Sequence, residues 1–176
     1  MSLMSDLTVR CRTRLTPGRV RRTLWIGVFC VTFPGILFAQ ALTLTFQTVS
    51  GGLSLSGSGT DTASMNFGNV SAYAPLGAGI TRSNGATDYT IGSDFGLMVV
   101  KGGRGGSPNY LVRARLTSSN PLTWSINGVV MTTTLQPVAN NQPYGSTVPY
   151  ALQFVVPKAS APGAASAVFE VRAVSN

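Results

Sequence analysis

The 176-residue chain has no histidine, five acidic residues and two cysteines. Both cysteines, Cys11 and Cys30, lie within the first 41 residues, so residues 42–176 cannot form a disulfide among themselves. The lack of histidine excludes nucleophile–histidine catalysis. Zinc sites built on cysteine or histidine are excluded from residues 42–176 for the same reason.

The four acidic residues beyond residue 41 are Asp61, Asp88, Asp94 and Glu170. Glu170 lies on the outward face of an alternating segment, and the aspartates lie in or beside turn-rich stretches, where Asp bonds its own backbone. The alternatives are a hydrolase that uses a carboxylate pair and a calcium ion held by Asp88 and Asp94, which no ligand-spaced loop supports. We therefore expect a non-enzymatic protein without a catalytic, metal or cofactor site.

The net charge of +8 is unevenly distributed. Six arginines and one aspartate give residues 1–41 a charge of +5, whereas seven basic and four acidic residues give the remainder only +3. A basic chain suggests nucleic acid as a partner. Because most of the excess positive charge lies in residues 1–41, we expect no nucleic-acid partner.

Residues 1–41 have the three parts of a secretory signal. An arginine-rich region precedes the apolar run 24–39, and Ala39 and Ala41 are the small residues at the −3 and −1 positions of a cut before Leu42. The alternative, an uncleaved anchor, needs about 20 apolar residues, and this run is shorter and contains Pro34-Gly35. We expect export to the periplasm, cell surface or medium, with membrane contact only through the transient signal.

After residue 41 the chain alternates apolar and polar residues in short segments, the pattern of half-buried strands. Asn127-Gly128, between two such segments, predicts a type I′ hairpin. The expected strands are "LTLTFQ", "ASMNFG", "TDYTIG", "FGLMVV", "NYLVRARL", "LTWSI", "VVMTTTL", "YALQFVVP" and "AVFEVRAV". Many short strands with turns predict an all-β fold, a single antiparallel β-sandwich. We place this domain at 63–176, after an N-terminal strand or extension at 42–62.

The aromatic residues divide into core and candidate ligand contacts. Trp124 shares a face with Ile126, which favours the core. Tyr144 and Tyr150 lie in the proline- and asparagine-rich stretch "NNQPYGSTVPY" and are the candidates for an exposed pair facing a glycan, with packing against the sandwich as the alternative. The glycine-rich segment 101–110 has neither a GK[ST] ending nor a following helix, so we interpret it as a connecting loop.

Three stretches, "MNFGNV", "YLVRARL" and the C-terminal "LQFVVPKASAPGAASAVFEVRAVSN", resemble secreted pilin-like β-sandwich families related to spore coat protein U and chaperone–usher pilus subunits. The resemblance spans roughly residues 63–176. Its motifs are Phe67-Gly68-Asn69-Val70, Val156-Pro157, Pro162-Gly163 and the alternating Phe169, Val171 and Ala173. The chain departs from many pilus subunits in having no disulfide and no tyrosine near its C-terminus.

The resemblance implies a structural or surface subunit that completes a neighbour's sandwich by β-strand addition. Leu42, Leu44 and Phe46 form the apolar face of the candidate donor strand, and Gly51-Gly52 supplies a joint after it. Self-association or other surface subunits are then the expected partners, with a glycan as the alternative. The strand "LTLTFQ" has a second interpretation, as the first strand of its own complete sandwich.

Overall fold

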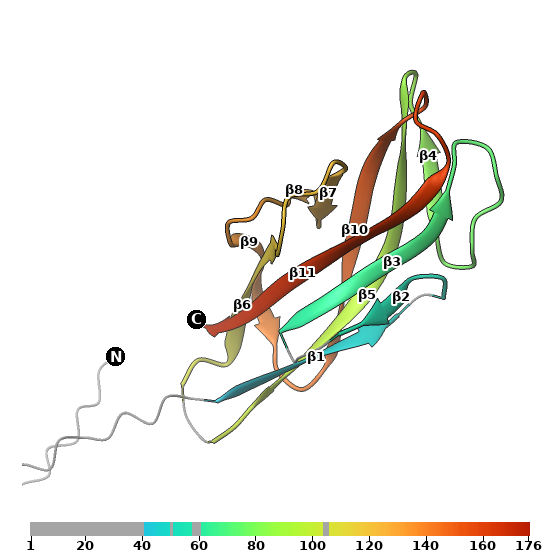
Figure 1. The fold of residues 1–176 in the computed structure, drawn as a ribbon. Coiled ribbons are helices and arrows are strands. Elements are labelled where there is room, and N and C mark those ends of the chain that lie inside the picture. Colours follow the sequence, from blue (N-terminus) through green and yellow to red (C-terminus); the bar gives the residue numbers. More distant parts are fainter. Residues whose placement is uncertain (1–40, 50, 58–60, 104–105) are drawn as a thin grey trace, which may run out of the picture. The chain divides into compact units, whose positions relative to one another are not determined.

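The computed structural model describes residues 41–49, 51–57, 61–103 and 106–176 (Figure 1). The predicted signal segment, including Ala39, lies outside the described residues except for Ala41. Within the described ranges no helix is long and apolar enough to cross a membrane. The strands are β1 (Leu42–Thr48), β2 (Ser54–Ser56), β3 (Thr62–Val70), β4 (Thr81–Asn84), β5 (Asp88–Lys101), β6 (Asn109–Leu116), β7 (Thr123–Ile126), β8 (Val129–Val130), β9 (Gln136–Pro143), β10 (Thr147–Pro157) and β11 (Gly163–Ser175).

The strands form two antiparallel sheets that pack face to face, which confirms the predicted all-β sandwich. Sheet A has the order β1-β5-β10-β7-β8, with β4 also paired to β5. Sheet B has the order β2-β3-β11-β6-β9, and Figure 1 shows its long central strands β3 and β11 side by side. The stretch 42–62, predicted as a strand or extension before the domain, contributes β1 to sheet A and β2 to sheet B.

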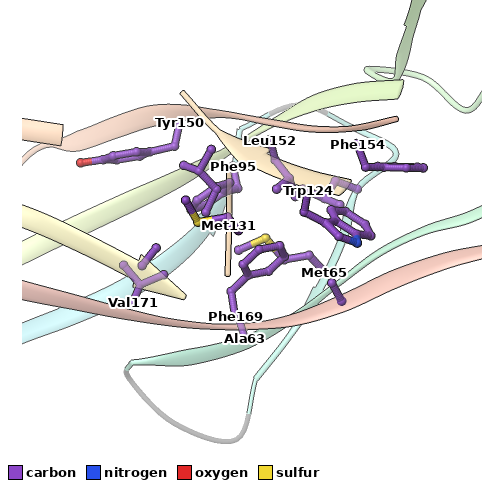
Figure 2. Close-up of a cluster of buried hydrophobic side chains, with 14 of the residues drawn as sticks. Ala63, Met65, Phe95, Trp124, Met131, Tyr150, Leu152, Phe154, Phe169 and Val171 are labelled. Atoms are coloured by element: carbon purple, nitrogen blue, oxygen red, sulfur yellow. The ribbon is translucent and has the colours of Figure 1, made fainter. Parts of the chain in front are cut away.

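Aromatic side chains from both sheets meet in the core (Figure 2). Trp124 of sheet A is fully buried, as its position on the face of Ile126 predicted. Its ring centroid lies 4.4 Å from that of Phe154 in the same sheet and 5.7 Å from that of Phe169 in sheet B. Phe67 of β3 contacts Phe154 edge-on at 4.9 Å. These contacts between rings of different sheets join the two layers.

The predicted hairpin is present at Asn127 and Gly128, which have φ angles of 50° and 79°. Positive φ at both central residues is what a type I′ turn requires. The turn joins β7 to β8, which pair through Ser125 with Val130 and Ile126 with Val129.

Two of the expected strands, "TDYTIG" and "FGLMVV", are one continuous strand, β5. Gly92 ends the first of these expected strands and Gly96 lies inside the second, and both glycines lie where side chains from the two edges of β5 close over the strand. A Cβ at Gly96 would lie 2.7 Å from side-chain carbons of Thr147 and Val49, and one at Gly92 would lie 3.2 Å from Gln153 and Thr81. The glycines therefore permit close cross-strand packing and do not end the strand.

Strand β9 occupies residues that the turn signal Asn140-Asn141 marked as a break. It pairs with β6 through two register irregularities, and Asn141 adopts a φ of 55° inside it. Bulges accommodate such a residue in an edge strand. Conversely, the segment expected to form a strand from Val129 keeps only Val129–Val130 as β8.

Candidate functional site at the N-terminal strand

Strand β1 lies on one edge of sheet A. It pairs antiparallel with β5, from Leu42 opposite Lys101 to Thr48 opposite Phe95. Further along, the same edge of β5 is covered by β4, from Thr81 opposite Gly92 to Asn84 opposite Tyr89. Two short strands therefore share one edge of the longest strand in the described fold.

The apolar face of β1 points into the sandwich, with the phase that the sequence predicted. Leu44 is buried with only 5% of its surface exposed, and Leu42 and Phe46 are partly buried against the core. The ring centroid of Phe46 lies 6.3 Å from that of Phe95. The candidate donor residues thus fill the interior of their own chain, which is the second interpretation of this strand.

The other edge of β1 has no strand partner among the described residues. Its alternate backbone N–H and C=O groups are therefore available for pairing, because a strand bonded on one side keeps half of these groups free. Leu42–Thr48 contains no charged residue and no proline. Charge and proline are the usual protections of an exposed edge.

The other sheet edges in the described fold are shorter or better protected. Strands β2 and β8 have three and two residues. Strand β9 has eight residues, but it carries Pro137 and Pro143 and pairs irregularly with β6. Strand β1 is consequently the edge best suited to backbone pairing with another strand.

On the outer surface of sheet A, Gln47 near the C-terminal end of β1 makes side-chain hydrogen bonds to Thr147 and Met98, a set of contacts that we name the clasp. The Thr147 hydroxyl of β10 donates to Gln47 Oε1 at 2.7 Å, over the intervening strand β5. Gln47 Nε2 donates to the Met98 sulfur at 3.7 Å. The clasp passes over Gly96, where a Cβ would meet Thr147 and Val49 at 2.7 Å. Glycine at this position therefore leaves room for the side chains of Gln47 and Thr147 to meet above β5.

A groove of about 230 Å³ runs along the seam between the two sheets beside β1. The seam exists because β1 and β2 are edge strands of different sheets and do not pair with each other. The lining is mainly apolar and comes from β1, from β2 with the residue after it, and from β3: Leu44, Thr45, Phe46, Leu55, Ser56, Gly57 and Ala63.

The peptide bond of the predicted cut lies at the start of β1. The carbonyl of Ala41 accepts a hydrogen bond from the Gly102 N–H at 2.8 Å, which continues the pairing of β1 with β5 by one residue. Leu42 is the first residue of the strand. A cut at this position would leave β1 intact as the new N-terminus.

Tyr144 and Tyr150 do not form an exposed pair. Tyr150 is fully buried on β10, where its ring stacks on Phe95 at 5.6 Å, so the prediction that it faces a ligand is wrong. The residue before it is an exposed proline, but the strand continues through both and turns Tyr150 inward. Tyr144 is half-buried, 5.0 Å from the ring of Tyr110 and with Lys101 Nζ 5.4 Å above its own ring.

The hydroxyls of Tyr110 and Tyr150 are both buried between the sheets. Neither makes a well-formed hydrogen bond within the described part of the chain. Burial raises the pKa of both groups, and for Tyr150 the neighbouring Tyr110 raises it further. Both phenols are therefore neutral side chains of the core.

The acidic residues do not gather into a site. Asp88 and Asp94 are six residues apart on one extended strand, about 20 Å by the rise of a strand, so a calcium ion cannot bind both. Among the described residues no three acidic, histidine or cysteine side chains are close enough to hold a metal. Glu170 lies on the outward face, as predicted, but two arginines cover it: Arg115 Nε donates to Oε2 at 2.6 Å and Arg172 Nε to Oε1 at 2.5 Å.

Two surface features had no distinguishing signal in the sequence. Tyr73 is 83% exposed on the loop after β3, where Ser71 Oγ accepts from the Ala74 N–H at 2.8 Å. The ion pair between Glu170 and Arg115 joins residues 55 positions apart, so only the pairing of β6 with β11 brings them together. The alternation of apolar and polar residues indicated that Arg115 and Glu170 face outward, but it did not indicate that the two residues are neighbours.

No protein-family model, curated protein or solved structure matches this chain. The fold and its exposed edge define the molecule as an antiparallel β-sandwich with an uncharged N-terminal edge strand. Any assignment of function therefore follows from the chemistry of its own surfaces.

Proposed function

We propose that this chain is an exported, non-enzymatic structural or cell-surface protein whose subunits associate by exchange of strand β1. The observation that supports the proposal best is β1 itself: an edge strand without charge or proline, whose Leu44 is buried in the core. Export is supported by the signal pattern of residues 1–41, which ends where β1 begins.

Strand exchange needs no new contact surface. The β1–β5 pairing and the burial of Leu44 are the same whether β1 comes from the same chain or from a neighbour. What differs is the connection between β1 and β2, which either turns back or extends to another molecule. The fold requires this connection to cross from sheet A to sheet B between Thr48 and Ser54.

Gly52 makes the closed connection possible. Its φ is 99°, in the region that favours glycine, and a Cβ there would lie 2.0 Å from the carbonyl oxygen of Ala78. The adjacent Gly51 is unlike it, because a Cβ at Gly51 would make an ordinary contact of 3.7 Å with the same oxygen. A side chain at Gly52 therefore disfavours the closed turn, while one at Gly51 is tolerated.

The difference between Gly52 and Gly51 provides a test of strand exchange. In Gly52→Ala the closed turn is strained, so we expect the extended connection to be favoured and dimers or longer oligomers to form at concentrations where Gly51→Ala stays as the wild type. Size-exclusion chromatography with light scattering over a range of protein concentrations measures the distribution. Mixing chains that carry two different tags then shows whether the oligomers contain exchanged subunits.

Two results contradict strand exchange. One is a Gly52→Ala protein that is less stable yet monomeric at every concentration at which it stays folded. The other is wild-type protein that remains monomeric at high concentration, together with a variant lacking residues 42–48 whose stability is unchanged, because β1 would then contribute nothing to the sandwich.

A further inference from the structure

Three arginines cluster on the outer face of sheet B, in a group that we name the arginine patch: Arg113 and Arg115 of β6, and Arg172 of β11. The strand register places Arg172 opposite Arg113, and Glu170 opposite Arg115. Directly opposed side chains in a sheet start about 5 Å apart, and next-but-one neighbours about 7 Å apart along the strand. The three side chains therefore arise from one small area.

Glu170 holds two of these arginines in place. Arg115 Nε donates to Oε2 at 2.6 Å, with Nη2 also in contact, and Arg172 Nε donates to Oε1 at 2.5 Å. The Glu170 side chain is only 10% exposed, whereas those of Arg115 and Arg172 are 39% and 56% exposed. A guanidinium has five N–H donors. Both arginines therefore keep donors that face the solvent in an orientation fixed before any ligand binds.

The patch keeps an excess of positive charge. Three arginines against Glu170 leave +2, and Arg113 is exposed and forms no ion pair within the described ranges. Asp61 precedes β3, on the other side of β11 from β6, and the described structure gives it no ion pair with the patch. The patch is therefore complementary to a ligand with several negative charges.

A second copy of this chain is a poor source of those charges. Its acidic residues beyond residue 41 are Asp61, Asp88, Asp94 and Glu170, and in the described fold no three of them form a group. Glu170 is itself occupied by two arginines. The complementary surface must come from a different molecule.

We propose that the arginine patch binds an acidic polysaccharide, through the carboxylate or sulfate groups along an extended chain. The patch lies on a sheet face beside β3, whose outward residues Thr62, Ser64 and Asn66 offer hydroxyl and amide groups to sugar hydroxyls. This inference does not depend on strand exchange, because no residue of β1 takes part in it.

The chemistry of the patch separates this ligand from two other polyanions. Single-stranded nucleic acids are bound with aromatic side chains on which bases stack, and β6 and β11 carry no outward aromatic residue beside the patch. Surface binding to membranes uses bulky apolar groups that insert among lipids. The exposed apolar side chains of β11 are only Val168 and Val174.

The experiment compares variants of the full chain for binding to immobilised heparin and to polygalacturonate. The double variant Arg113→Gln/Arg172→Gln removes two patch charges. The matched control, Lys101→Gln/Lys158→Gln, removes two charges elsewhere, at the end of β5 and in the turn after β10. Because the arginines of residues 1–41 also attract polyanions, the readout is the difference between the two double variants.

We expect the patch variant to bind roughly tenfold more weakly at low salt, with a shallower dependence on salt, and the control to differ little from the wild type. Equal losses in the two variants, or no loss in either, overturn the proposal. Binding to single-stranded DNA or to anionic lipid vesicles that is as tight, and as sensitive to the patch variant, overturns the choice of polysaccharide. Far-UV circular dichroism and the urea midpoint confirm that each variant is folded.

Discussion

Replacing Trp124 tests the core that joins the two sheets. The side chain is fully buried, with ring centroids of Phe154, Phe169 and Phe67 at 4.4, 5.7 and 5.9 Å. Trp124→Ala removes the indole from this cluster and leaves a cavity. Truncations of this kind cost about 3–5 kcal/mol of unfolding free energy. Since a domain is stable by only about 5–15 kcal/mol, we expect a protein close to its folding limit.

Trp124→Phe separates the contribution of side-chain packing to the free energy of unfolding from that of the indole N–H group. The indole N–H has no hydrogen-bond acceptor among the described residues. A buried unpaired donor costs about 1–3 kcal/mol, so phenylalanine removes this penalty while it gives up part of the packing. We therefore expect Trp124→Phe to cost less than half as much as Trp124→Ala.

Urea denaturation followed by far-UV circular dichroism measures both costs. In addition, Trp25→Phe leaves Trp124 as the sole tryptophan of the chain. Its fluorescence should then be blue-shifted and inaccessible to iodide in the folded protein. A solvent-exposed spectrum, or a Trp124→Ala cost below about 1 kcal/mol, would refute the packing of the sheets described above. A Trp124→Phe cost close to that of Trp124→Ala would contradict the expectation that removing the unpaired N–H offsets part of the lost packing.

The remaining predictions concern the clasp over β5 and the ion pairs on sheet B. Gly96→Val places side-chain atoms where Thr147 and Val49 already lie, so we expect it to cost about 1–3 kcal/mol and to speed amide hydrogen exchange in β1, whereas unchanged exchange would argue against the clasp. The hydrogen bond from Arg115 lowers the pKa of Glu170 below its usual 4.5, against the opposing effect of burial and with further help from Arg172. This stabilisation is complete above the unfolded pKa and is lost as the pH falls through the folded one. Glu170→Gln should thus cost about 1–2 kcal/mol near neutral pH and progressively less as the pH falls through the folded pKa of Glu170, as measured by urea unfolding; a cost independent of pH would contradict the ion pairs.

The features that the sequence predicted are those encoded by near neighbours in the chain. Strict alternation placed Leu44, Trp124 and Phe169 on buried faces, because side chains of a strand point to opposite sides in turn. The Asn127-Gly128 turn was predictable because two adjacent residues with positive φ determine the hairpin.

The same reasoning failed where distant segments override a local signal. Gly92 ended one expected strand and Phe95-Gly96 began the next, but side chains from β10 and from residues beside β5 on its other edge close over both glycines and the strand is continuous. Tyr150 stands between the loop-like stretch "NNQPYGSTVPY" and the expected strand "YALQFVVP"; pairing with Phe95 of β5 places it inside β10 and buries its ring. The packing over the glycines cannot be read from a short window of sequence, since it depends on which strand lies alongside, whereas the alternation of Tyr150 with Leu152 and Phe154 is consistent with its buried position.

The candidate sites likewise have some features that the sequence predicts and others that only the tertiary structure shows. The sequence by itself determined that β1 is apolar on one face, uncharged and followed by two glycines. Only the tertiary structure decided that β1 forms an edge of sheet A, that Gly52 closes against Ala78, and that Arg115 and Arg172 share Glu170. The physical reason is that alternation is a property of the backbone of one strand, whereas an edge, a close approach and an ion pair require a second segment whose position follows from the packing of the whole domain.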